Sequence, residues 1–129
     1  MNSGVAVIVL AAGLGKRMKS QKAKVLHDVL GKPMVVHVVE AARQVAGTVV
    51  VVVGNQAEEV RRVVSRSADV LYADQDRQLG TGHAVMCALP HLPAGCEQIV
   101  ILCGDTPLIR ASTLKGLVRD HLEHRRDVT

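Results

Sequence analysis

Aromatic residues are almost missing from this chain of 129 residues: Tyr72 is the only one, and there is no Phe or Trp. Hydrophobic residues still make up 48% of the sequence, so the core must be aliphatic. The length suits one domain. Proteins that hold single-stranded nucleic acid usually stack the bases on aromatic rings. The scarcity of rings therefore argues against a nucleic-acid partner.

Cysteines and long apolar runs are also scarce. Cys87, Cys96 and Cys103 are odd in number, irregularly spaced and without a C-x-x-C pair, which argues against a disulfide framework and a zinc site. The apolar run near the N-terminus has no charged leader and is too short for a signal peptide or a membrane span. We therefore expect a cytoplasmic protein with no membrane partner.

Positive charge is concentrated in one segment of a chain whose formal net charge is +4. Five cations lie within nine residues, with no acid between them: Lys16, Arg17, Lys19, Lys22 and Lys24. Such a cluster suits a phosphate-rich small ligand as well as it suits nucleic acid. A solvated basic loop is the ordinary alternative.

The hydrophobic pattern alternates strands with helices. The predicted strands are Val5–Leu10, Val49–Val53, Val70–Ala73 and Ile99–Cys103, and the predicted helices are Lys32–Val45, Ala57–Ser65, Thr81–Leu89 and Ser112–Arg126. This alternation predicts a three-layer α/β/α fold with a mostly parallel sheet. A strand order of 3-2-1-4 leaves the apolar fourth strand at an edge, where unpaired backbone favours self-association. Because the chain stops just after a helix, we expect a truncated version of the fold.

The segment Leu10–Met18 (LAAGLGKRM) follows the first buried strand. It therefore lies at the carboxyl edge of the sheet, where open α/β folds bind ligands. Met18 occupies the position of the third glycine of a G-x-G-x-x-G dinucleotide fingerprint. Arg17 occupies the Ser/Thr position of a P-loop, so neither motif is present. Four small residues nevertheless allow backbone N–H groups to approach a phosphate: Ala11, Ala12, Gly13 and Gly15.

Three later segments extend this motif: KVLH at 24–27, QDRQLGTGHA at 75–84 and GDTPL at 104–108. Together, in this order, they resemble the pyrophosphorylase domain of the bifunctional N-acetylglucosamine-1-phosphate uridyltransferase/glucosamine-1-phosphate acetyltransferases. The first motif alone would indicate only the broad nucleotidyltransferase superfamily, and KVLH and LGTGHA narrow the resemblance. It implies a Rossmann-like nucleotide-diphospho-sugar transferase fold. Residues 1–129 would be the N-terminal nucleotide-binding part of one nucleotidyltransferase domain, without the acetyltransferase domain.

The resemblance also implies an activity. The enzyme would transfer a nucleotidyl group from UTP to N-acetylglucosamine 1-phosphate with Mg²⁺, giving pyrophosphate and UDP-N-acetylglucosamine, a peptidoglycan and polysaccharide precursor. Three alternatives remain open: a non-catalytic nucleotide-binding fragment, a relative using another nucleotide or sugar 1-phosphate, and a nucleic-acid-binding module built on residues 16–24. The sugar contacts and a second metal ligand are expected beyond these residues.

The matched positions receive roles from the same resemblance. The nucleotide-binding positions are Leu10, Ala11, Ala12, Gly13, Gly15, Lys24, Gln75, Gly80, Thr81, Gly104 and Asp105. Among them Gln75, Gly80 and Thr81 would read the uracil, and Asp105 would bind Mg²⁺. Arg17 and Lys24 would be catalytic, holding the triphosphate and neutralising charge as pyrophosphate leaves.

Each role has an ordinary alternative. Gln75 could be a surface residue, Thr81 could be a helix N-cap, and Asp105 could cap the turn into Pro107. The sequence also departs from the family: Lys16 replaces a small hydroxyl residue, and Ala23 replaces the proline before Lys24, which is expected to loosen that loop. Of the histidines, we expect His37 to be a surface residue or one satisfied locally, and His83 to support the base pocket at most weakly.

Overall fold

The computed structural model describes residues 4–13 and 22–129. The strands are β1 (Val5–Leu10), β2 (Asp28–Val29), β3 (Lys32–Pro33), β4 (Thr48–Val53), β5 (Leu71–Asp74) and β6 (Gln98–Cys103). The α-helices are α1 (Met34–Arg43), α2 (Ala57–Ser65), α3 (Thr81–Ala88) and α4 (Ala111–Glu123). Two short 3₁₀ helices, η1 (Lys24–Leu26) and η2 (Leu89–His91), complete the described elements.

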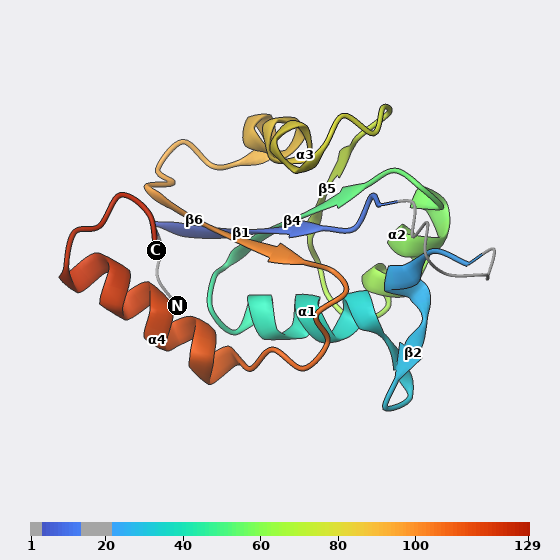
Figure 1. The fold of residues 1–129 in the computed structure, drawn as a ribbon, viewed down its shortest axis with the longest axis horizontal. Helices are drawn as coiled ribbons and strands as arrows, with labels where there is room; N and C mark the ends of the chain where they lie inside the picture. Colours follow the sequence, from blue (N-terminus) through green and yellow to red (C-terminus); the bar gives the residue numbers. More distant parts are fainter. Residues whose placement is uncertain (1–3, 14–21) are drawn as a thin grey trace.

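A four-stranded parallel sheet forms the centre, in the order β5-β4-β1-β6. This is the predicted order 3-2-1-4, which is confirmed. Leu10 at the end of β1 is opposite Val52 of β4 on one side and Cys103 of β6 on the other. All four strands therefore end at one side of the molecule, on the right in Figure 1.

The valine-rich strands bury both faces because successive side chains alternate in direction. Val7 and Val9 face the larger core, which α1, α2 and α4 complete, while Ile8 faces a smaller core completed by α3. Figure 1 shows α3 on one side of the sheet and α1 and α4 on the other. The three-layer α/β/α prediction is confirmed, and both cores are aliphatic.

A small hairpin precedes α1 and was missed in the sequence. Strands β2 and β3 pair antiparallel around Leu30 and Gly31, whose φ angles are 53° and 85°. Since Lys32 and Pro33 belong to β3, α1 begins at Met34 and not at Lys32. Lys32 Nζ lies 2.9 Å from Glu40 Oε2 of α1, and this hydrogen bond holds the pKa of the Glu40 carboxyl below its ordinary value.

The only aromatic ring joins β5 to α2. The Tyr72 hydroxyl donates to the Arg61 carbonyl at 3.4 Å, and the Arg61 guanidinium lies 5.3 Å from the ring centroid. Partial burial raises the pKa of the Tyr72 phenol above its ordinary value. The contacts show how β5, predicted at Val70–Ala73 and observed one residue later, docks on its helix.

The opposite edge of the sheet is less covered. In β6, Ile99 is 40% exposed and Ile101 is 48% exposed, whereas Leu114 and Val118 of α4 are buried against the other face. The strand carries no charged residue or proline that would protect its edge. Within residues 4–13 and 22–129, no helix is both long and apolar enough to cross a bilayer.

Candidate nucleotide site

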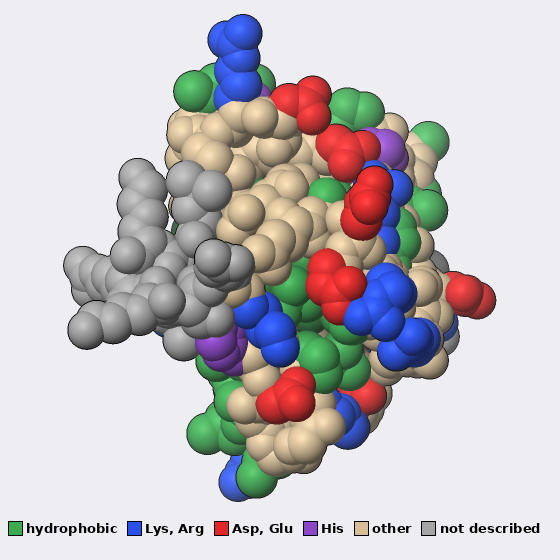
Figure 2. All heavy atoms as spheres, turned by 90° about the vertical axis from the view of Figure 1, so that its right-hand side faces the viewer, with side chains coloured by type: hydrophobic (Ala, Val, Ile, Leu, Met, Phe, Trp, Pro, Cys, Tyr) green, Lys and Arg blue, Asp and Glu red, His purple; other side chains and the backbone are tan. Residues whose placement is uncertain are grey.

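The ends of β1 and β6 meet at a shared rim. The Gly104 N–H donates to the Leu10 carbonyl at 2.9 Å, directly after the last residue of β6. A Cβ at Gly104 would lie 3.0 Å from that carbonyl oxygen and 3.1 Å from Val25 Cγ1. Glycine therefore allows the backbone after β6 to approach β1, and it brings Asp105 beside the start of the loop that follows Leu10. Figure 2 looks onto this end, where acidic and basic side chains gather.

Main-chain and amide groups hold the first residues of that loop. The Ala11 N–H donates to the Val52 carbonyl at 2.9 Å, which continues the β1–β4 pairing. The Ala12 carbonyl accepts the Gln78 side-chain amide at 2.9 Å and the Asn55 N–H at 3.3 Å. Ala11 and Ala12 are buried and Gly13 is exposed. Gly15 and Arg17, which were predicted to contact the nucleotide, and Lys16, one of the clustered cations, lie outside the described residues.

The segment that carries Lys24 is anchored. Ala23 is buried, and its N–H donates to Gln56 Oε1 at 2.9 Å. Proline has no N–H and could not make this bond. The expectation that Ala23 loosens the segment is therefore wrong. After Lys24, the side chains of Val25 and Leu26 in η1 are buried and fix the segment on the core.

Lys24 and Asp105 form an ion pair at the rim. Lys24 Nζ lies 3.2 Å from Asp105 Oδ2, and the two side chains are 47% and 35% exposed. The turn after β6 is closed by Thr106, whose hydroxyl donates to the Cys103 carbonyl at 2.8 Å. The alternative that Asp105 caps this turn is therefore wrong. Both charged groups remain accessible to a ligand at the rim.

The donor set at Asp105 is compatible with Mg²⁺. Magnesium is usually held by one or two carboxylates together with substrate phosphates and water. In the described part of the chain, no three His, Cys, Asp or Glu side chains gather into a metal site. Asp105 thus offers a single carboxylate, and a bound phosphate would have to supply further oxygen ligands.

Gln75 is the buried polar side chain of this region, with 4% of its surface exposed. Its Nε2 lies 3.2 Å from the Gly80 carbonyl and 3.0 Å from His83 Nδ1. The alternative of an ordinary surface residue is therefore wrong. Gly80, at φ 101°, is the N-cap of α3, and Thr81 is the first helical residue. The N-cap role proposed for Thr81 is wrong as well.

A cavity of about 350 Å³ lies where β4 and β5 end. It is lined by Val53, Gly54, Asn55, Ala57, Asp74, Gln75, Asp76 and Gln78. Gly54 is tightly enclosed here, because a Cβ on it would lie 2.8 Å from the Gln75 carbonyl oxygen and 3.1 Å from Ala12 Cβ. The ends of β1, β4 and β5 therefore meet as closely as those of β1 and β6.

Three amide side chains of the site were missed in the sequence: Asn55, Gln56 and Gln78. Asn55 Nδ2 lies 3.5 Å from the Gly13 carbonyl, and the other two bond to Ala23 and Ala12. Their common signal is an amide residue within a few positions of a strand end, at the edge where parallel sheets bind ligands. That signal is visible in the sequence, but it does not identify the partners of the three amides.

His37 and His83 both have partners. His37 Nε2 lies 2.5 Å from the Val29 carbonyl, so the expectation of local satisfaction is confirmed. His83 Nδ1 contacts the Gln75 side-chain amide, and His83 Nε2 lies 3.8 Å from Cys87 Sγ. The histidine is thus part of the surroundings of Gln75.

Comparisons with known proteins reveal relatives at about 50% identity. The chain is 52% identical to the bifunctional protein GlmU of Geobacter sulfurreducens over 118 residues, which cover 91% of this chain and 25% of that protein. It is 50% identical to the same protein of Thermoanaerobacter pseudethanolicus over 127 residues, covering 98% and 27%. The chain spans about a quarter of the length of these curated relatives.

Solved structures share the fold at lower identity. A nucleotidyl transferase from Methanothermobacter thermautotroptrophicus matches with a TM-score of 0.82 at 22% identity, covering 92% of this chain and 58% of that one. A Mycobacterium tuberculosis H37Rv protein in complex with manganese matches with a TM-score of 0.70 at 21% identity, and the match covers 92% of this chain and 60% of that one. HddC from Yersinia pseudotuberculosis, complexed with GMP-PN, matches with a TM-score of 0.72 at 22% identity, and the match covers 92% of this chain and 54% of that one.

The model of one protein family accounts for nearly the whole chain. The match covers residues 7–129, from within β1 to the last residue. It includes the rim formed by Leu10 and Asp105 and the buried Gln75. This chain therefore belongs to the family of MobA-like NTP transferase domains.

Proposed function

We propose that residues 1–129 form the nucleotide-binding part of a domain that transfers a uridylyl group from UTP to N-acetylglucosamine 1-phosphate. The observation that carries this proposal is the accessible Lys24–Asp105 pair beside the end of β1. The two substrates are those implied by the family resemblance of the sequence, and the matches to bifunctional GlmU proteins at about 50% identity support a nucleotidyl transfer. The products would be pyrophosphate and UDP-N-acetylglucosamine, a peptidoglycan precursor made in the cytoplasm.

In this reaction an oxygen of the sugar 1-phosphate attacks the α-phosphorus of UTP, and pyrophosphate leaves. A phosphate monoester has a second pKa of about 6 and is already largely dianionic at neutral pH. No general base is therefore needed. Catalysis rests on alignment of the two substrates and on neutralisation of phosphate charge.

The residues of the rim would divide this work. Lys24 and Arg17 would hold the triphosphate and neutralise charge on the departing pyrophosphate. The role of Arg17 rests on its place in the sequence motif, since it lies outside the described residues. Asp105 would hold Mg²⁺, which supplies additional positive charge to the phosphates. The manganese complex of one structural neighbour supports a divalent cation, and the GMP-PN complex of another supports a nucleotide.

The nucleotide itself would lie along the carboxyl edge of the sheet. The backbone of Leu10, Ala11, Ala12, Gly13, Gly15 and Gly104 would follow the nucleotide. Gln75, Gly80 and Thr81 would read the uracil. With one aromatic residue in the chain, hydrogen bonds must select the base, and a glutamine amide can pair with the acceptor and donor groups of uracil.

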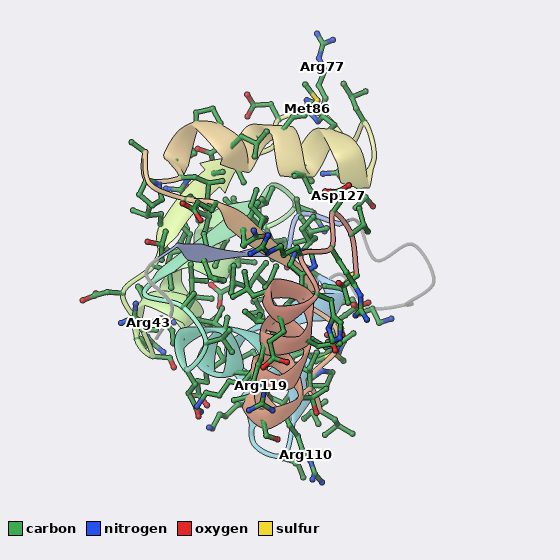
Figure 3. All side chains as sticks on the ribbon, turned by 90° about the vertical axis from the view of Figure 1, so that its left-hand side faces the viewer. Arg43, Arg77, Met86, Arg110, Arg119 and Asp127 are labelled. Carbon is green, nitrogen blue, oxygen red and sulfur yellow. The ribbon has the colours of Figure 1, made fainter. Side chains whose placement is uncertain are left out.

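Four arginines outside the rim give little support to a polyanion track. In Figure 3, which views the opposite end, Arg43, Arg77, Arg110 and Arg119 project from different sides of the molecule. Recognition of long nucleic acids relies on a basic patch or stripe. These four arginines form no such stripe, and with one aromatic residue in the chain a compact phosphate ligand is favoured over a nucleic acid.

Nucleotide titration tests the proposal. Calorimetry with the 129-residue chain is expected to show Mg²⁺-dependent UTP binding at least about tenfold tighter than CTP binding, since a mismatched polar group costs on the order of 1–3 kcal/mol. A parallel pyrophosphate-release assay with N-acetylglucosamine 1-phosphate separates an active chain from a nucleotide-binding part. Failure to bind any nucleotide, or salt-sensitive binding to long polyanions alone, would contradict the proposal.

We further propose that the β6 edge allows self-association. Ile101→Lys places a charge on the exposed edge strand and is expected to shift the sedimentation profile towards monomer. Leu71→Lys is the matched control, because Leu71 is 46% exposed on the other edge strand, β5. An unchanged profile for Ile101→Lys, or an equal shift for both variants, would sink the assignment to β6.

A further inference from the structure

Gln75 can present either an acceptor or a donor to a ligand, because a side-chain amide has one of each. Which atom faces inward is ordinarily a matter of assignment. Here the Gly80 carbonyl decides it. A backbone carbonyl can only accept, so the Gln75 atom that lies 3.2 Å from it must be the amide nitrogen.

His83 uses the second hydrogen of that nitrogen. Its Nδ1 lies 3.0 Å from Gln75 Nε2, and the hydrogen not given to Gly80 is available for this contact. For the contact to be favourable, His83 Nδ1 must carry a lone pair and the imidazole proton must be on Nε2. That proton then points towards Cys87 Sγ, 3.8 Å away and one helical turn later in α3.

The oxygen of Gln75 is left for a ligand. Among the described residues, Oε1 has no hydrogen-bond partner, yet no fully buried side-chain oxygen or nitrogen in this part of the chain lacks one. Oε1 therefore remains accessible even though the residue as a whole is 4% exposed. Gln75 offers an acceptor, and both donors are occupied inside the protein.

We propose that His83 is a positioning residue that, together with the Gly80 carbonyl, holds the Gln75 amide with its oxygen towards the ligand, so that the site selects bases carrying a ring N–H. This inference rests on the proposed function. Uracil and thymine carry a hydrogen on N3, whereas N3 of cytosine is an acceptor. An amide free to rotate could pair with either kind of base, but a locked acceptor repels N3 of cytosine.

The ratio of CTP to UTP dissociation constants tests the role of His83. His83→Leu removes one of the two acceptors that hold the amide nitrogen, and the ratio is expected to fall by about tenfold, because the Gly80 carbonyl alone then opposes a turn of the NH₂ towards cytosine. His83→Asn is the matched control, since an asparagine oxygen can accept the Gln75 hydrogen in place of Nδ1. It is expected to keep the ratio within about threefold of the wild-type value.

Four outcomes decide between the possibilities. Loss of selectivity in His83→Leu with retention in His83→Asn supports the inference. Retention in both variants, or loss in both, overturns it while UTP binding by the wild type leaves the proposed function standing. Absence of nucleotide binding by the wild type would instead overturn the proposed function itself, and with it this inference.

A second measurement does not depend on the folding of a variant. Nitrogen-15 NMR of the wild-type chain is expected to show His83 as the Nε2–H tautomer, with the Gln75 amide hydrogens shifted by hydrogen bonding. A neutral Nδ1–H tautomer at His83 would overturn the inference, because that hydrogen would oppose the NH₂ of Gln75. This result decides the question if His83→Leu shows no cooperative thermal unfolding.

Discussion

Asp105→Asn and Lys24→Met are each expected to lower pyrophosphate release in the complete enzyme by at least about 100-fold, the range typical for loss of one charge-stabilising group. In the 129-residue chain, Asp105→Asn should abolish the Mg²⁺ dependence of UTP binding, and Lys24→Met should weaken the binding. The reason is that the Lys24 ammonium and the Asp105 carboxylate lie at the rim where β1 and β6 end, where they would contact the phosphates and the metal ion. Calorimetry and a coupled pyrophosphate assay measure the two effects.

The fold is expected to tolerate both changes. Ion pairs as exposed as Lys24–Asp105 contribute about 0–1 kcal/mol to stability, so the melting temperature should barely move. Lys32→Met is the matched control: Lys32 forms a comparably exposed pair with Glu40 of α1, and neither residue has been assigned to the nucleotide. It should leave UTP binding unchanged. Full binding and turnover in Lys24→Met or Asp105→Asn would refute the assigned roles.

Gly54→Ala is expected to disturb both stability and binding. The added Cβ would lie 2.8 Å from the Gln75 carbonyl oxygen and 3.1 Å from both Ala12 Cβ and Gln78 Nε2. Since the first neighbour is backbone, the strand ends must separate. Overpacking of this kind costs about 1–3 kcal/mol. Urea unfolding followed by circular dichroism should show this loss, and UTP binding should weaken because Ala12 and Gln75 are displaced.

Gly116→Ala supplies the opposite control. Gly116 lies inside α4, and a Cβ there would meet no heavy atom within 4 Å. Alanine is the better helix former, so this change should raise the free energy of unfolding by about 0.5–1 kcal/mol and leave UTP binding unaltered. Equal effects of the two substitutions would show that the crowding around Gly54 is not what matters.

The sheet could be predicted from the sequence because its strands are uninterrupted β-branched runs buried on both faces. Val5–Leu10 was predicted with its observed limits, and the second strand differs by one residue, Thr48. Because parallel strands end at one edge of a sheet, the sequence also predicts that Asp105, just after the fourth strand, lies at the same edge as the loop after Leu10. The hairpin of β2 and β3 could not be predicted, because two residues per strand are too few to show a period.

The partners within the site were harder to predict than the site's position. The Lys24–Asp105 pair depends on how residues 22–26 return to the sheet, which Gln56 helps to determine from 33 positions away. Gln56 itself has φ 54°, an unusual conformation that no local pattern indicates. Gln75 was singled out, but its contact with His83 depends on the glycine N-cap that starts α3.

Tyr72 makes the molecule spectroscopically simple. Ultraviolet excitation of this protein produces emission from one phenol only, and that phenol sits between β5 and α2. Because its pKa is raised in the folded state, its stabilising contribution is complete below the ordinary phenol value and is lost as pH rises through the folded value. A single intrinsic chromophore can thus report alkaline unfolding of that corner, while the absorbance of a nucleotide at the rim is read almost without protein background.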